Sequence, residues 1–95
     1  MNEISIYKLL TLDNPKIIDI RDKYSYTMNS LDGAINIPYY SLLSNYSLYL
    51  NKEETYYLYC DYGKQSKEIS NRLNLFGYKT FYVKEGYLDF QKKIK

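Results

Sequence analysis

The clearest apolar run in the chain is Thr55–Cys60, a stretch with almost no polar interruption. Such a run is typical of a central parallel strand that is covered on both faces. A second run, Ile17–Ile20, is short and rich in β-branched residues, and it predicts another buried strand. The segment Thr80–Val83 predicts a third strand from the same residue types.

A helix is predicted over residues 64–76, directly after the first of these runs. Its apolar positions Ile69, Leu73 and Phe76 are spaced i, i+4 and i+7, which places them on one helical face. Gly77 is expected to end the helix as a left-handed cap, with the residue after it packed against Leu73. A strand, a helix and a strand within about 30 residues form a βαβ unit, so the two strands should be parallel with a right-handed crossover.

Weaker patterns predict a brief strand and a short helix within residues 2–12, a strand within 33–38, one or two helices within 39–50, and a final helix over 87–94. In the final helix, Leu88, Phe90 and Ile94 are expected to face inward. Residues 23–31 are polar and are expected to form an irregular loop. This order of elements predicts one α/β domain covering residues 1–95.

The composition is that of an ordinary globular protein, with 45% apolar and 25% charged residues among 95. No apolar stretch approaches the roughly 20 residues that span a bilayer, and the first residues lack the basic and apolar regions of a secretory signal. A net charge of +2 is too small to predict a nucleic-acid partner, and no basic stripe accompanies the 14 tyrosines. We therefore expect neither a nucleic-acid nor a membrane partner.

Two residue counts limit the chemistry, because the chain has one cysteine and no histidine. A single cysteine cannot form an internal disulfide, and a cytoplasmic location is the simplest interpretation. The lack of histidine excludes Ser-His-Asp and Cys-His catalysis within this chain. One cysteine without histidine also makes a structural zinc site implausible, so no metal is expected.

The single cysteine, Cys60, stands at the end of the predicted central strand and just before a predicted helix. In an open α/β sheet, ligands bind at the carboxyl ends of the strands, and a helix start favours negative charge. Gly63 allows the loop between strand and helix to turn its N–H groups inward. We interpret Cys60 as a nucleophile held as a thiolate, with Lys64 and Lys67 in support and Asp61 opposed through its like charge. The alternative is that Cys60 is a buried small hydrophobic residue.

Two other uses of this loop fit the sequence less well. Gly63-Lys64 lacks the earlier glycine of a phosphate-binding P-loop, and Ser66 comes one place too late for that motif. Because no base is present to activate a hydroxyl, Ser66 is expected to cap the helix or support the loop instead of acting as a nucleophile.

Four segments in order carry a family likeness over residues 17–90. Ile17–Asp22 is an apolar strand that ends in Asp-x-Arg, and Asp32–Pro38 contains Gly-Ala-x-Asn-x-Pro. The loop Cys60–Ser66 has a glycine three places and a serine six places after its cysteine. Glu85-Gly86 forms a later turn, and Phe90 stands where a tryptophan is common. Together these segments resemble the rhodanese family of sulfurtransferases.

The resemblance implies a mainly parallel five-stranded sheet flanked by helices on both faces. It also implies a sulfurtransferase, in which Cys60 takes a sulfane sulfur from thiosulfate or a persulfide and passes it to cyanide or a thiol, which can belong to a protein. No cofactor is implied, because the cysteine itself carries the sulfur. The backbone N–H groups of the loop would hold the Cys60 persulfide much as an oxyanion hole does, and the loop residues are Asp61, Tyr62, Gly63, Lys64, Gln65 and Ser66.

Residues outside the loop are expected to support it. Asp19 and Arg21 are interpreted as an ion pair that anchors the loop from behind, with direct substrate contact as the alternative. The protein is expected to be a monomer, and acceptors are expected to dock near Tyr62, Lys64 and Lys67.

This sequence departs from the family pattern at two positions. Asp61 replaces an arginine that often follows the cysteine, and Ser30 stands at about the place of a family histidine. Both departures lower the positive charge near the pocket, so we expect poor use of thiosulfate, a dianion, and a rise in thiosulfate turnover in Asp61→Arg.

Two alternative functions remain open at this point. The Asp61 departure is the best support for a non-catalytic rhodanese-like binding or regulatory module. A phosphatase of the same fold would need a loop that is one residue longer and closed by an arginine, whereas the sixth residue after Cys60 is Ser66 and the nearest arginine is Arg72.

Overall fold

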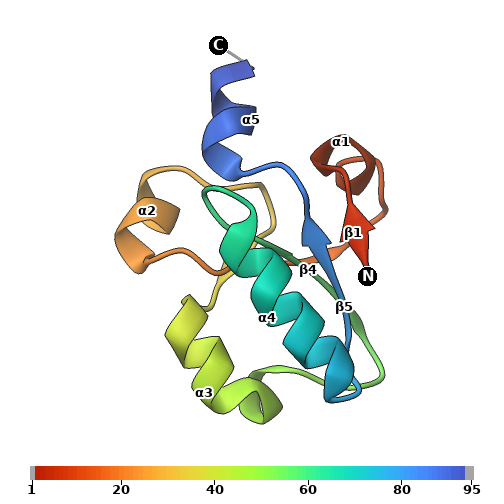
Figure 1. Ribbon diagram of the computed structural model, residues 1–95. Helices are drawn as coiled ribbons and strands as arrows, with labels where there is room; N and C mark the ends of the chain where they lie inside the picture. Colours follow the sequence, from red (N-terminus) through yellow and green to blue (C-terminus); the bar gives the residue numbers. More distant parts are fainter. Residues whose placement is uncertain (1, 94–95) are drawn as a thin grey trace.

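A computed structural model describes residues 2–93 of the protein as an α/β fold built on a five-stranded sheet in the order β1-β5-β4-β2-β3 (Figure 1). All neighbouring strands run parallel, as the sequence predicts for the central ones. The strands are β1 (Glu3–Ile4), β2 (Lys16–Asp19), β3 (Ile35–Asn36), β4 (Thr55–Tyr59) and β5 (Lys79–Val83).

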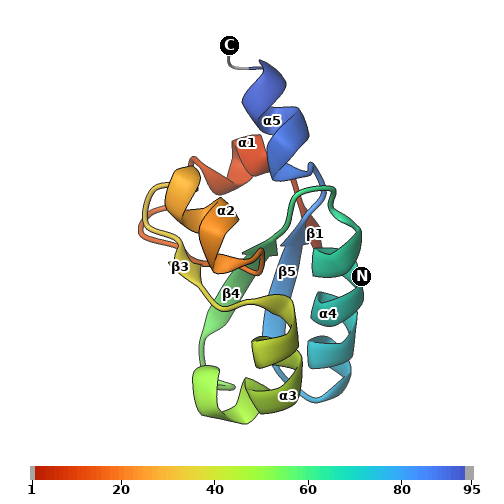
Figure 2. The same ribbon diagram turned by 90° about the vertical axis from the view of Figure 1, so that its left-hand side faces the viewer.

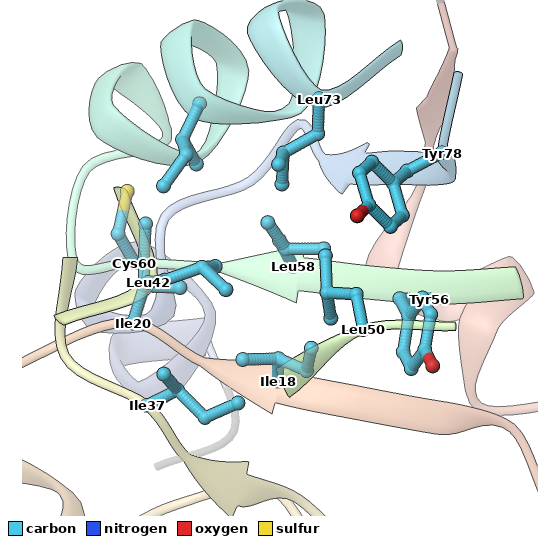
Figure 3. Close-up of a cluster of buried hydrophobic side chains, with 11 residues drawn as sticks. Ile18, Ile20, Ile37, Leu42, Leu50, Tyr56, Leu58, Cys60, Leu73 and Tyr78 are labelled. Atoms are coloured by element: carbon cyan, nitrogen blue, oxygen red, sulfur yellow. The ribbon is translucent and has the colours of Figure 1, made fainter. Parts of the chain in front are cut away.

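Helices cover both faces of this sheet, and Figure 2 shows α3 and α4 side by side. The helices are α1 (Ile6–Leu9), α2 (Lys23–Met28), α3 (Tyr39–Tyr49), α4 (Lys64–Leu75) and α5 (Tyr87–Lys93). One core lies between the sheet and the pair α3 and α4 (Figure 3). The second core lies on the opposite face and includes residues of α1 and the first residue of α5.

Strand β4 is the centre of the molecule, and its position explains its unbroken apolar sequence. It pairs with β2 on one side and β5 on the other. Tyr56, Leu58 and Cys60 face the core under α3 and α4, whereas Tyr57 and Tyr59 face the opposite core. Because both faces are covered, polar and apolar residues do not alternate along this strand. The predicted strand is confirmed.

The βαβ unit β4-α4-β5 is also confirmed, including the end of its helix. Gly77 has a φ of +95°, and the N–H group of Tyr78 donates to the Leu73 carbonyl at 3.0 Å. These two features form the Schellman motif that the glycine predicts. Tyr78 and Leu73 also lie in the same core cluster, as expected.

Several sequence-based expectations are wrong in detail. Residues 23–28 form the helix α2 instead of an irregular loop, because the Asp22 carboxylate caps the helix by accepting the Ser25 N–H bond. None of the residues of α2 is buried, so no apolar periodicity marks it. Phe76 is not inward: it follows the last helical residue, is 46% exposed and stacks on Tyr46.

The two remaining helical segments agree with the sequence in part. A non-helical residue, Asn45, divides α3, which matches the expectation of one or two short helices. In α5 the buried residue is Tyr87, while Leu88 is half-buried and Phe90 packs at the edge of its core. Ile94, the third expected inward residue, lies outside the described residues. Among residues 2–93, no helix has the length and apolar character that crossing a membrane requires.

Candidate active site

Cys60 directly follows β4, at the carboxyl edge of the sheet, and its side chain is directed toward α4 (Figure 3). Its Sγ atom accepts N–H bonds from Gly63 at 3.2 Å and from Ser66 at 3.3 Å. The Ser66 hydroxyl lies 3.4 Å from the same sulfur and donates to the Gly63 carbonyl at 3.1 Å. Two backbone donors aimed at one sulfur atom, at the start of a twelve-residue helix, stabilise negative charge on that sulfur.

The loop can take this shape because of Gly63. Its φ of +86° lies in the left-handed region, and a Cβ atom there would lie 2.9 Å from the Lys84 carbonyl oxygen. Helix α4 begins at the next residue. The glycine therefore turns the chain sharply enough to point two amides back at Cys60.

The turn between β5 and α5 braces this loop from the other side. The Tyr87 N–H group donates to the Cys60 carbonyl at 2.9 Å, and the Leu88 N–H group donates to the Asp61 carbonyl at 3.3 Å. Gly86 lies so close that a Cβ atom would overlap the Asp61 carbonyl oxygen. The backbone of the loop is therefore fixed by segment 86–88 as well as by its own hydrogen bonds.

A buried polar network lies behind the loop, and Asp19 is its centre. The Asp19 carboxylate is fully buried and accepts hydrogen bonds from the Arg21 guanidinium at 2.8 Å and from the Tyr59 hydroxyl at 2.6 Å. The Tyr59 oxygen in turn accepts the N–H bond of Leu31 at 3.0 Å. Burial, and then the hydrogen bond to Asp19, raises the pKa of Tyr59 well above its ordinary value. Tyr59 therefore remains a neutral donor.

Arg21 joins this network to the cysteine loop. Its Nη1 atom lies 3.3 Å from Oδ1 of Asp61, and its guanidinium lies 4.4 Å from the centre of the Tyr87 ring. Burial acts to lower the pKa of Arg21, but the hydrogen bonds and charge of Asp19 outweigh it, so the pKa lies above its ordinary value. Arg21 is a permanent cation beside the loop.

A cavity of about 420 Å³ lies at Cys60. Its walls are formed by Arg21, Asp22, Cys60, Asp61, Tyr62, Lys64 and Gln65. Cys60 itself is only 3% exposed. A reactant must therefore enter this cavity to reach the sulfur atom.

Comparison with known proteins identifies the family of this chain. The family model for the rhodanese-like domain matches residues 5–93. This chain belongs to the rhodanese-like domain family. A relative from Ogataea parapolymorpha, the adenylyltransferase and sulfurtransferase uba4, is 30% identical over 77 residues, which are 81% of this chain. The matched part of the chain spans 20% of that protein's length.

Two solved structures are similar to this chain in fold. The protein SSP1007 from Staphylococcus saprophyticus is 31% identical to this rhodanese-like chain, with a TM-score of 0.81 over 94% of this chain and 91% of that one. The human single-domain sulfurtransferase TSTD1 has a TM-score of 0.81 at 19% identity, over 98% of this chain and 97% of that one. At that identity the second likeness shows the fold alone.

The rhodanese-like structure brings most of the predicted site residues together. Asp19 and Arg21 form the expected ion pair. Gly63 and Ser66 supply amides to the sulfur, and the other predicted loop residues line the cavity. Lys67 does not line the cavity, because its amine lies over the Tyr82 ring, 6.0 Å from its centre.

Other residues around the site were not found from the sequence. Asp22 lines the cavity, while Tyr59 and Tyr87 hold Arg21 and the loop backbone. Tyr59 and Tyr87 are 28 residues apart, and only the meeting of β4 with the start of α5 places them together. Of these three residues, only Asp22 could have been found from a local pattern. It is an aspartate directly after the Asp-x-Arg segment, and aspartate is a common residue at the start of a helix.

Glu85 connects this site to the start of the chain. Its carboxylate accepts the Ile6 N–H bond at 2.8 Å and the Ser5 hydroxyl at 3.2 Å. Because Gly86 and Tyr87 follow directly, Glu85 fixes the turn that braces the Cys60 loop. We expect Glu85→Ala to slow Cys60 alkylation by iodoacetamide several-fold and to lower the free energy of unfolding by about 1–2 kcal/mol.

The control for this prediction is Glu85→Gln, which keeps an oxygen that can accept the Ile6 N–H bond. Its alkylation rate and urea midpoint should stay close to those of the unaltered protein. If Glu85→Gln were as slow as Glu85→Ala, the hydrogen bond would not be what positions the loop.

Proposed function

We propose that this protein is a sulfurtransferase that carries a sulfane sulfur on Cys60. The observation that supports this best is the pair of amides, from Gly63 and Ser66, directed at Sγ of Cys60, a residue that lines an open cavity. These donors can stabilise the thiolate before transfer and, as the sulfur chain lengthens into the cavity, an anionic persulfide after it. The absence of histidine is compatible with this chemistry, because an anionic sulfur needs no general base.

The reaction proceeds in two displacements. The Cys60 thiolate attacks the outer sulfur of a persulfide donor, a new S–S bond forms, and the donor's S–S bond breaks with its electron pair leaving on the donor thiolate. An acceptor thiolate then attacks the outer sulfur of the Cys60 persulfide, and Cys60 leaves as the thiolate. No electrons enter or leave the system, so no external oxidant or cofactor is required.

The test is intact-mass measurement after incubation of the reduced protein with thiosulfate and, separately, with glutathione persulfide. We expect a gain of one sulfur atom that cyanide or excess thiol removes. Cys60→Ser should lose this gain completely, because Cys60 is the only cysteine. Persistence of the gain in Cys60→Ser would contradict the assignment.

The competing function is a non-catalytic rhodanese-like module. The observation in its favour is the Arg21–Asp61 contact, which holds the Asp61 carboxylate on the wall of the cavity beside Cys60, in addition to that of Asp22. A folded protein that gains no sulfur from either donor would support this module, and capture of its binding partner would be the next experiment.

A further inference from the structure

We propose that Asp61, held in place by Arg21, makes the Cys60 cavity select reactants by charge: it favours persulfide donors RSSH whose R group is neutral or cationic and disfavours dianions such as thiosulfate. This inference specifies the donor class of the function proposed above and rests on it for the sulfur-transfer step. The selection itself concerns any small molecule that reaches Cys60.

The position of the Asp61 carboxylate is the first observation. Asp61 directly follows Cys60, and its side chain is 30% exposed, whereas that of Arg21 is 5% exposed. Both residues line the cavity at Cys60. The Arg21 contact at 3.3 Å orients the carboxylate on this wall, so its charge lies where a reactant enters.

The second observation is that Arg21 has few donors left for a bound anion. Its Nε and Nη2 atoms donate to Asp19, and Nη2 also donates to the Asn29 carbonyl. Nη1 donates to Asp61. An anionic donor that used this arginine would have to compete with a carboxylate that is already bound to it.

The third observation is the charge balance of the cavity wall. Two cations, Arg21 and Lys64, face two anions, Asp22 and Asp61. Among residues 2–93, Arg21 is also paired with the buried Asp19, whereas no ion pair involves Lys64. When the buried Asp19 is counted with these four side chains, the negative charges outnumber the positive ones by one. The Cys60 thiolate adds a further negative charge. A dianion meets repulsion at this entrance, and a cationic group meets attraction.

The sulfur-transfer step balances for both donor classes. With a persulfide RSSH, the Cys60 thiolate takes the outer sulfur with its hydrogen, and the thiolate RS⁻ leaves. With thiosulfate, the thiolate takes the outer sulfur to give the Cys60 persulfide anion, and sulfite leaves with two negative charges. Only the second reaction brings a dianion into the cavity and releases another from it.

The first part of the test needs no sulfur transfer. Iodoacetamide and iodoacetate differ mainly in charge, and both are thiol-alkylating reagents. The quantity measured is the rate of alkylation by iodoacetamide divided by the rate of alkylation by iodoacetate. We expect this ratio to be about tenfold higher in the folded protein than in the same chain unfolded in urea. Asp61→Asn should reduce this preference to within about threefold, and added salt should reduce it in the unaltered protein.

The second part measures rates of Cys60 loading by intact mass, with thiosulfate as the dianionic donor and cysteamine persulfide as the cationic one. The ratio of Asp61→Asn to unaltered protein is taken for each donor, which cancels the donor's own reactivity. We expect a ratio of about ten for thiosulfate and a ratio below one for cysteamine persulfide.

The control is Asp13→Asn, which makes the same change in net charge. Asp13 is exposed and precedes β2, so it lies at the amino edge of the sheet, opposite Cys60. The ratio of the rate for Asp13→Asn to the rate for the unaltered protein should be one for every reagent. If that control moved the ratios as much as Asp61→Asn did, overall charge and not the cavity would be responsible.

The two parts separate failure of this inference from failure of the proposed function. The charge selection would be overturned, with sulfur transfer intact, by two results together. The preference for iodoacetamide over iodoacetate would be the same in the folded protein as in urea, and the rate ratio of Asp61→Asn to unaltered protein would be the same for both donors. A clear preference for iodoacetamide with no sulfur loading from either donor would support the charge selection by the cavity and overturn its assignment to a sulfur donor.

Discussion

Replacing Gly86 with alanine is expected to slow Cys60 alkylation at least about tenfold and to lower the free energy of unfolding by about 3 kcal/mol. A Cβ atom at this position would overlap the Asp61 carbonyl oxygen and lie 2.6 Å from the Tyr62 Cα atom. Both atoms belong to the backbone of the Cys60 loop, so no side-chain rotation can relieve the overlap. The loop must shift, and the amides of Gly63 and Ser66 would then no longer point at the sulfur.

The matched control is Gly33→Ala. Gly33 has a φ of +83°, but a Cβ atom there would meet nothing within 4 Å. This variant should lose about 1–2 kcal/mol through backbone strain alone and keep its alkylation rate. Iodoacetamide kinetics and urea unfolding, measured on both variants, separate a displaced loop from a general loss of stability. An unchanged alkylation rate in Gly86→Ala would show that the turn does not brace the loop.

The second large effect is expected for Asp19→Ala, which should lower the free energy of unfolding by about 3–5 kcal/mol. Asp19 is fully buried and is the main partner of both Arg21 and Tyr59. Its removal leaves the buried guanidinium with only the partly exposed Asp61 as counter-ion, and it leaves the buried hydroxyl without its acceptor. Urea denaturation followed by circular dichroism measures the loss.

Two further variants, Tyr59→Phe and Glu54→Gln, serve as comparisons for the loss of unfolding free energy in Asp19→Ala. Tyr59→Phe removes the hydrogen bond to Asp19 and the acceptor of the Leu31 N–H group, and it should cost about 1–3 kcal/mol. Glu54 forms an exposed ion pair with Lys16 at 3.3 Å, and Glu54→Gln should cost at most about 1 kcal/mol. If Asp19→Ala were no worse than Glu54→Gln, the buried network would not be what holds Arg21 beneath the loop.

The parts of the fold that were predictable from the sequence are those in which neighbouring residues carry the whole signal. Strand β4 has an apolar residue at nearly every position because both of its faces are buried. The end of α4 follows from Gly77, whose left-handed conformation is a local property. The position of Cys60 between this strand and this helix then placed it at the carboxyl edge of the sheet.

The features that escaped the sequence depend on contacts between distant residues or on exposed elements. Arg21 meets Asp61 across 40 positions of sequence, and no local pattern specifies that pairing. Helix α2 buries none of its residues and so has no apolar period. Phe76 had the correct spacing for the inner face of α4, but the helix ends one residue before it. Its ring then stacks on Tyr46 at the edge of the core.

The contact between Ser5 and Glu85 joins residues that are 80 positions apart, and this has a consequence for synthesis on the ribosome. At roughly 5–20 residues per second, the Ser5 region waits about 4–16 seconds before Glu85 is made. Strand β1 also lacks its partner until β5 has been completed. Because the turn that braces the cysteine loop belongs to the same late segment, the nascent chain acquires its ordered thiol only after nearly all of the described residues have been translated.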